Sequence, residues 1–191
     1  MKKHLITAVL YTVVTGVLLC IVYPLAVTGI ARLLFPRQAA GQLITRNGKL
    51  VGSHWIGQAF TGPTYFHSRP SAAGAGYDAD ASSGSNLAST SKAWTDSVEA
   101  RVAASVASEQ SAAPVPVDLV TASASGLDPE ISPAAALYQV PRVAKERHLP
   151  VPVVEALTRR YITPRQFGLL GEPRVNVLEL NLALDAIAAK D

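Results

Sequence analysis

The sequence predicts an α+β protein with one N-terminal transmembrane helix followed by a single small mixed α+β extramembrane domain. Two observations support this class. Residues 5–31 carry no charged side chain, and the remainder has ordinary mixed polarity with both helical and strand-like apolar spacing. The chain therefore divides into a short basic tail (1–4), a transmembrane helix (5–35) and a soluble domain (36–191).

The apolar run is long enough to cross a bilayer. A helix over residues 5–31 rises roughly 40 Å, against a hydrocarbon core of about 30 Å. The run exceeds the roughly 7–15 apolar residues of a secretory signal, and no A-x-A-like cleavage site precedes Arg32. Pro24 lies inside the run, so we expect a kink near Tyr23 and Pro24.

Composition excludes several classes of protein. The net charge is +3, but Lys2 and Lys3 supply most of the excess, so a nucleic-acid-binding surface is not indicated. The single cysteine, Cys20, falls within the membrane helix. The soluble domain therefore has neither a disulfide nor a cysteine-based metal site.

The charges that flank the helix disagree about orientation. Basic residues on the domain side outnumber those of the tail, and simple counting places the domain in the cytoplasm. A short basic start followed at once by an apolar helix is instead typical of an uncleaved signal anchor, and large domains translocate largely regardless of charge. We expect a bacterial inner-membrane protein whose amino terminus is cytoplasmic and whose domain lies outside, in the periplasm.

The first part of the domain is predicted to be a hairpin followed by an ordered loop. Between residues 41 and 60, two apolar pairs flank Asn47 and Gly48, as in a β-hairpin with a tight turn. Residues 61–85 are rich in turn-forming residues but also carry Tyr65, Phe66 and Tyr77. Because aromatic rings need something to pack against, this segment is expected to be ordered.

Helices dominate the rest of the prediction. Apolar spacing predicts a helix over 87–108, and 117–121 suits a short strand. Ser132 and Pro133 begin a further helix toward His148, which Pro141 is expected to kink or split. Helices also fit 151–161 and 176–189, although alternating leucines make a strand the rival interpretation of the last segment.

Motifs for catalysis or metal binding are weak. There is no phosphate-binding G-x-x-x-x-G-K-[ST] loop, and no pair of histidines has zinc-ligand spacing. Asp78 and Asp80 partly resemble a calcium loop, but acidic turn residues that bond their own backbone fit better. A serine hydrolase using His54, His67 or His148 is an alternative without the G-x-S-x-G elbow that such enzymes need. We therefore predict no catalytic and no metal-ligating residue.

Five short stretches carry a resemblance to a known family. They are Tyr-Phe-His-Ser-Arg-Pro-Ser at 65–71 with Gly-Ser-Asn-Leu at 84–87, Ser-Gly-Leu-Asp-Pro at 125–129 with Tyr-Gln-Val-Pro-Arg-Val-Ala at 138–144, and Val-Asn-Val-Leu at 175–178. With the amino-terminal helix, they resemble the KdpC family, the C subunits of Kdp potassium-transporting P-type ATPases. Pro141 departs from the family, which usually has a helix-compatible residue there.

The resemblance implies a non-catalytic accessory subunit of a potassium uptake complex. Its implied partners are a potassium-channel-like subunit, a P-type subunit that hydrolyses ATP, a small single-helix subunit and membrane lipid. The chain has no Asp-Lys-Thr-Gly phosphorylation motif, in keeping with an accessory role. No tightly bound cofactor is implied, and any contact with ATP is expected to come through the partner subunit.

Two mechanisms attributed to such subunits need opposite orientations. In one, the subunit is a catalytic chaperone that raises ATP affinity, which carries over here to Gln139 as a nucleotide contact with Arg142 near a phosphate. In the other, the domain lies outside and stabilises the assembly, with the helix docking through Thr12, Thr15, Gly16 and Ala26. We expect the second mechanism, in which Arg69 forms either a partner contact or an internal salt bridge.

Overall fold

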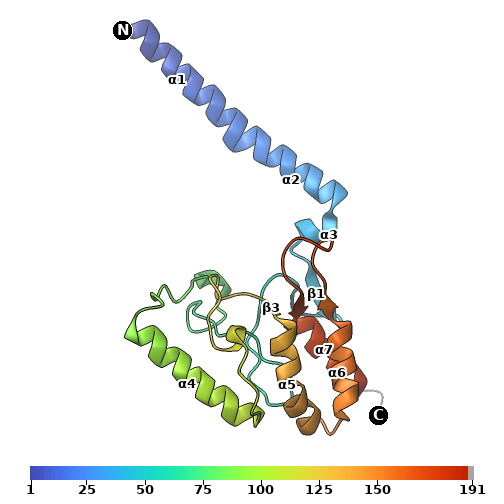
Figure 1. Ribbon diagram of the computed structural model, residues 1–191. Coiled ribbons are helices and arrows are strands. Elements are labelled where there is room, and N and C mark those ends of the chain that lie inside the picture. The colour runs from blue at the N-terminus through green and yellow to red at the C-terminus, as the bar shows by residue number, and fades with distance from the viewer. Residues whose placement is uncertain (189–191) are drawn as a thin grey trace. The chain divides into compact units, whose positions relative to one another are not determined.

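The computed structural model describes residues 1–188. It divides into two compact units, Met1–Val51 and a second unit that begins at Gly52. A membrane-compatible helix occupies the first unit, and a mixed helix and small-sheet domain forms the second (Figure 1). The predicted α+β class is thereby confirmed.

The first unit is built around one long helical rod. It comprises α1 (Lys2–Val17), a π-helical turn (Leu18–Val22) and α2 (Tyr23–Leu34). This stretch is long and apolar enough to cross a membrane, with a mean hydropathy of 2.5. The wide π turn ends two residues before Pro24, which lacks an N–H donor and whose ring clashes with the carbonyl four residues earlier, so a local change of helical winding is favoured there.

A short helix and the predicted hairpin follow the rod. Helix α3 (Pro36–Ala39) precedes β1 (Leu43–Arg46) and β2 (Lys49–Ser53), which form a two-stranded sheet. Asn47 and Gly48 both have positive φ, 52° and 75°, as a two-residue hairpin turn requires. The hairpin predicted from this dipeptide is confirmed.

The predicted helix over 87–108 exists but begins later. Helix α4 spans Lys92–Glu109, and the Trp94 N–H donates to the Ser91 side chain, which caps it. The Gly-Ser-Asn-Leu segment is therefore not the helix start. Serine in an extended conformation before a helical run is the stronger start signal, and it occurs at Ser91.

The strand predicted over 117–121 is wrong. Val117–Leu119 forms a 3₁₀ turn instead. Amide groups of residues 119–121 donate back to Pro116 and Val117 carbonyls, so they are not available to a sheet. Asp118 also accepts from the Ser132 N–H and hydroxyl group, which fixes the turn against the start of the next helix.

Three helices and a small sheet complete the domain. Helix α5 (Pro133–Glu146) packs against α4 and α6 (Val151–Arg160), and α6 packs against α7 (Val177–Ala188) (Figure 1). Strands β3 (Glu130–Ile131), β5 (Arg174–Asn176) and β4 (Ile162–Thr163) form an antiparallel sheet in that order. Ile131 and Ile162 both pair with Val175.

The helix predictions of this region hold with small shifts. Ser132 caps α5 by accepting from the Ala135 N–H, and Pro141 does not split the helix, because buried neighbours on both sides hold it in place. Helix α7 begins one residue later than predicted, after Asn176 accepts from the Glu179 N–H, and the rival strand over the leucines is wrong. Its predicted end at 189 lies outside the described residues.

The core lies where α5, α6, α7 and β5 meet. Its fully buried members include Phe66, Val143, Val154, Val175 and Leu184. Phe66 comes from the aromatic loop, so the prediction that residues 61–85 are ordered is confirmed.

Candidate functional site

An irregular segment at residues 63–67, here called the clamped segment, is held by many side-chain hydrogen bonds. Phe66 within it is fully buried in the core. Carbonyl groups along the segment accept hydrogen bonds from side chains of α5, of Arg147 directly after it, and of α7. The segment is therefore held by long side chains instead of by a strand partner.

Gln139 of α5 uses its whole amide group inside the domain. Its Oε1 accepts from the His67 N–H at 2.7 Å and from Arg142 Nη2 at 2.9 Å. Its Nε2 donates to the His67 carbonyl at 3.1 Å and to the Ala135 carbonyl at 3.2 Å. An amide has two donor and two acceptor positions, so all four are occupied. The residue is also only 1% exposed.

Arg142, one turn further along α5, is similarly occupied. Its Nη1 donates to the carbonyls of Pro63 and Tyr65, the latter at 3.0 Å. Its Nε donates to Glu109 at 2.8 Å, which ties α5 to the end of α4. Both charged side chains are almost wholly buried, at 6% and 4% exposure. This guanidinium thus neutralises a buried carboxylate while it organises the clamped segment.

Two further side chains complete the clamp. Asn181 of α7 accepts from the Phe66 N–H at 2.9 Å and donates to the Phe66 carbonyl at 3.0 Å. Arg147 donates to the Thr64 carbonyl at 2.6 Å and to Asp185 of α7 at 2.8 Å. Its guanidinium also lies 4.7 Å from the centre of the Tyr65 ring. Helices α5 and α7 are therefore joined through the backbone that lies between them.

The Glu109 carboxylate is incompletely satisfied. Its Oε1 accepts from Arg142, but its Oε2 is buried without a hydrogen-bond partner. His67 lies nearby, and its Nε2 is 3.0 Å from the Gly62 carbonyl. Burial lowers the pKa of the His67 ring below 6.5, and Arg142 acts in the same direction, against the Gly62 hydrogen bond and the Glu109 charge. His67 is therefore uncharged near neutral pH.

A second polar cluster joins two of the sequence segments singled out above. Arg69 donates from Nη1 to Asp128 at 3.1 Å, and the Tyr77 hydroxyl donates to the Arg69 carbonyl at 2.5 Å. The other Asp128 oxygen accepts from the Glu130 N–H at 3.0 Å. Of the two roles open to Arg69, the structure shows the internal salt bridge.

A cleft of about 660 Å³ opens beside this cluster. Arg69, Asp128 and Glu130 line one part of it, and Leu170 and Arg174 line another. Arg174 donates to Glu130 at 2.8 Å, and Arg69 is paired with Asp128. The cleft thus combines neutralised ion pairs with apolar surface and does not concentrate one sign of charge.

The histidines considered for catalysis or metal binding lie apart. His54 Nδ1 is 2.7 Å from Glu179, whereas His67 bonds Gly62. His148 follows α5 with a positive φ of 56°, in a helix-ending turn. Within residues 1–188, no group of three or more His, Cys, Asp or Glu side chains is close enough to hold a metal. Asp78 accepts from the Asp80 N–H at 3.0 Å, as expected for an acidic turn.

Sequence reasoning found Gln139 and Arg142 but missed three other residues of this bonded network, Asn181, Glu109 and Arg147. Asn181 had a readable signal, because an amide on the apolar face of a helix is costly unless it bonds a specific group. Glu109 and Arg147 had no comparable signal, since both appear in the sequence as ordinary surface charges. Their partners are distant in the chain, so only the fold brings them together.

The chain is similar to one described family over nearly all its length. That family is described as "KdpC: K+-transporting ATPase, c chain", and it matches residues 5–186. A protein named "Potassium-transporting ATPase KdpC subunit" from Acidobacterium capsulatum is 62% identical over 183 residues, covering 96% of this chain and 98% of the relative.

Two more relatives carry the same name. The one from Koribacter versatilis is 56% identical, covering 97% of this chain and 95% of the relative. The one from Methylococcus capsulatus is 56% identical, covering 97% of both chains.

Proposed function

The chain belongs to the KdpC family of potassium-transporting ATPase c chains, and from that premise we propose that it stabilises the assembly of the channel-like and ATP-hydrolysing subunits without catalysing a reaction itself. The family and the apolar helix make it a membrane-associated subunit of a potassium-transporting ATPase. The further proposal concerns how it acts within that complex.

The observation that carries the proposal is Gly16, a glycine that the helix itself does not require. Gly16 lies in the helical rod without a positive φ, and a Cβ added there would meet nothing within 4 Å. Alanine would favour the helix by about 1 kcal/mol over glycine. Small residues that recur every fourth position in a membrane helix allow another helix to approach closely. Ala8, Thr12 and Gly16 have this spacing and lie on one face of the helix.

The test enlarges this face. In the complete complex, Gly16→Leu is expected to reduce the amount of the other subunits that copurify with this chain. Thr7→Leu is the matched control, because it lies nine residues earlier and, at about 100° per residue, on the opposite side of the helix. Equal recovery of partners with both variants contradicts docking through this face.

The domain is proposed to lie on the outer side of the inner membrane, in the periplasm. The basic start followed directly by the apolar helix supports this orientation. Gln139 and Arg142, which the resemblance associates with nucleotide, have their polar groups occupied within the domain, and this supports a structural role for both.

The competing mechanism has Gln139 bind ATP in the cytoplasm. That contact requires the amide to release hydrogen bonds to His67, Arg142 or Ala135. Calorimetry of ATP with the full chain discriminates the two mechanisms. No saturable binding at micromolar nucleotide is expected, whereas saturable binding supports the chaperone mechanism.

A further inference from the structure

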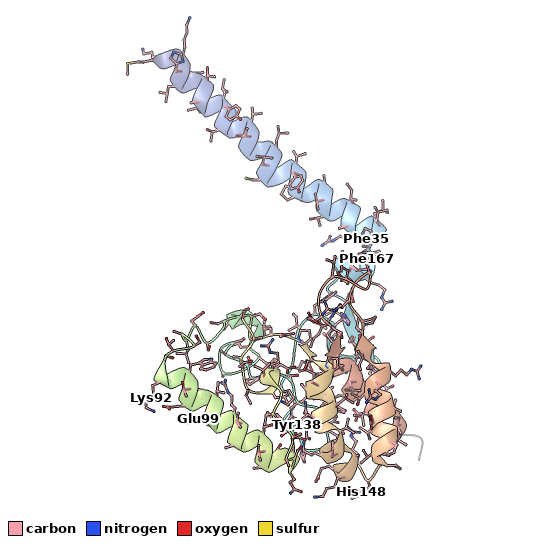
Figure 2. The ribbon with its side chains drawn as sticks, viewed as in Figure 1. Phe35, Lys92, Glu99, Tyr138, His148 and Phe167 are labelled. Atoms are coloured by element: carbon pink, nitrogen blue, oxygen red, sulfur yellow. The ribbon has the colours of Figure 1, made fainter. Side chains whose placement is uncertain are left out.

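The loop between β4 and β5 exposes an unusual concentration of apolar side chains. Phe167 is 96% exposed, Leu169 76% and Leu170 55%. The loop lies at the opposite end of the domain from His148 (Figure 2). We call residues 167–170 the apolar tip.

The apolar tip is a fixed structure. Gln166 and Leu170 exchange two backbone hydrogen bonds of 2.9 Å, which close a loop of three residues between them. Arg165 and Glu172 form an ion pair of 2.5 Å across its base. The loop therefore holds the Phe167 and Leu169 side chains outward, whereas Leu170 lies at the edge of the cleft described above.

Phe167 also occupies an uncommon backbone conformation. Its φ is 54°, a region that glycine or asparagine enters far more readily than a bulky residue. Such a conformation costs of order 1 kcal/mol or more and is characteristic of functional positions. The ring is thus presented to solvent at a cost that a smaller polar residue would avoid.

The membrane that holds the chain's own helix is within reach of the apolar tip. Residues 35–51 join the apolar helix to the domain, and at about 3.5 Å per residue they extend no further than about 60 Å. A tethered group needs little intrinsic affinity, because the tether keeps its local concentration near the membrane high. Arg160 is exposed at the end of α6, directly before the strand that leads into the loop, and its charge favours anionic headgroups.

We propose that the apolar tip inserts into the headgroup region of the bilayer that holds the chain's own helix. A narrow loop with side chains pointing outward suits a deformable lipid surface better than a preformed protein pocket. Phenylalanine and leucine buried about 5–10 Å into the headgroup and acyl boundary are typical of interfacial anchors. The contact gives the domain a second attachment beside the helix, and it does not depend on the proposed complex.

The test uses the full chain alone, in nanodiscs of phosphatidylcholine and phosphatidylglycerol. A nitroxide is attached to Leu169→Cys in a Cys20→Ser background, which leaves Phe167 in place. The rates at which the nitroxide collides with oxygen and with a water-soluble nickel chelate then report its depth in the bilayer. Val106→Cys is the control, since Val106 is also exposed but lies on α4.

The expected result is a nickel accessibility at Leu169→Cys at least about twofold below that of the control, with higher oxygen accessibility. Adding Phe167→Ser is expected to raise the nickel accessibility again. Equal values at both sites overturn the proposal. Protection that arises only when the partner subunits are added also overturns it, because the tip then contacts protein.

Discussion

Replacement of Gln139 by leucine tests whether the clamped segment depends on this amide. Gln139→Leu preserves approximate volume but leaves the His67 N–H and carbonyl without the partners described above. Each buried polar group without a partner costs about 1–3 kcal/mol, so the two together predict a loss of about 2–6 kcal/mol. Since domains are stable by about 5–15 kcal/mol, this is a large part of the total.

The assay is urea unfolding of the full chain in detergent, followed by tryptophan fluorescence. Lys145→Leu is the control, because Lys145 lies exposed on the same helix and is expected to change stability by less than about 0.5 kcal/mol. Gln139→Glu is expected to fall between them, since its carboxylate accepts from His67 and Arg142 but donates nothing. A Gln139→Leu midpoint equal to that of the control refutes the clamp.

Three further outcomes follow from the same contacts. Arg142→Met leaves Glu109 buried without its cation and is expected to lower the free energy of unfolding by about 3–5 kcal/mol. Much of this loss is expected to be recovered when Glu109→Leu is added. A double-mutant cycle that shows no coupling between the two positions contradicts the ion pair. Because burial lowers the pKa of His67, the unfolded chain binds more protons than the folded chain below pH 6.5, and stability falls as the pH falls from there. The denaturation midpoints at pH 7.5 and pH 5.5 are therefore expected to differ less in His67→Gln than in the unmodified chain. An unchanged difference rejects the role of His67 in this pH dependence. At Gly126, φ is 67° and an added Cβ would lie 2.6 Å from the Ala73 N and Ser83 O atoms, so Gly126→Ala is expected to lower stability by more than about 2 kcal/mol in thermal unfolding. Gly171 has a similar φ of 74° but open space around it, so Gly171→Ala is expected to lower stability by only about 1 kcal/mol. Equal losses in the two variants disprove the role of close packing at Gly126.

Local signals predicted much of the fold correctly. The Asn47 and Gly48 turn, the Ser132 cap and the helix after Pro150 each depend on residues close together in sequence. The strand over 117–121 failed because β propensity was outweighed by a tertiary contact, the Asp118 carboxylate bonding Ser132. The order of the three-stranded sheet was not readable, since its strands have only two or three residues each.

The site was predictable only in its most distinctive members. Gln139 and Arg69 were singled out through segments that resemble a family, but their bonding partners lie 72 and 59 residues away. No local pattern specifies such pairs. The clamp is a product of topology, because side chains of α5 and α7 reach the clamped segment from positions far apart in the sequence.

The measurement that tests the central claim most directly is the side of the membrane on which the domain lies. Ala113 is exposed in the loop after α4, and Cys20 is the only native cysteine. Ala113→Cys in a Cys20→Ser background is treated with a membrane-impermeant maleimide on intact cells. Labelling without lysis is the predicted result and keeps Gln139 away from cytoplasmic ATP. Protection until lysis contradicts the account and makes the nucleotide mechanism the better explanation.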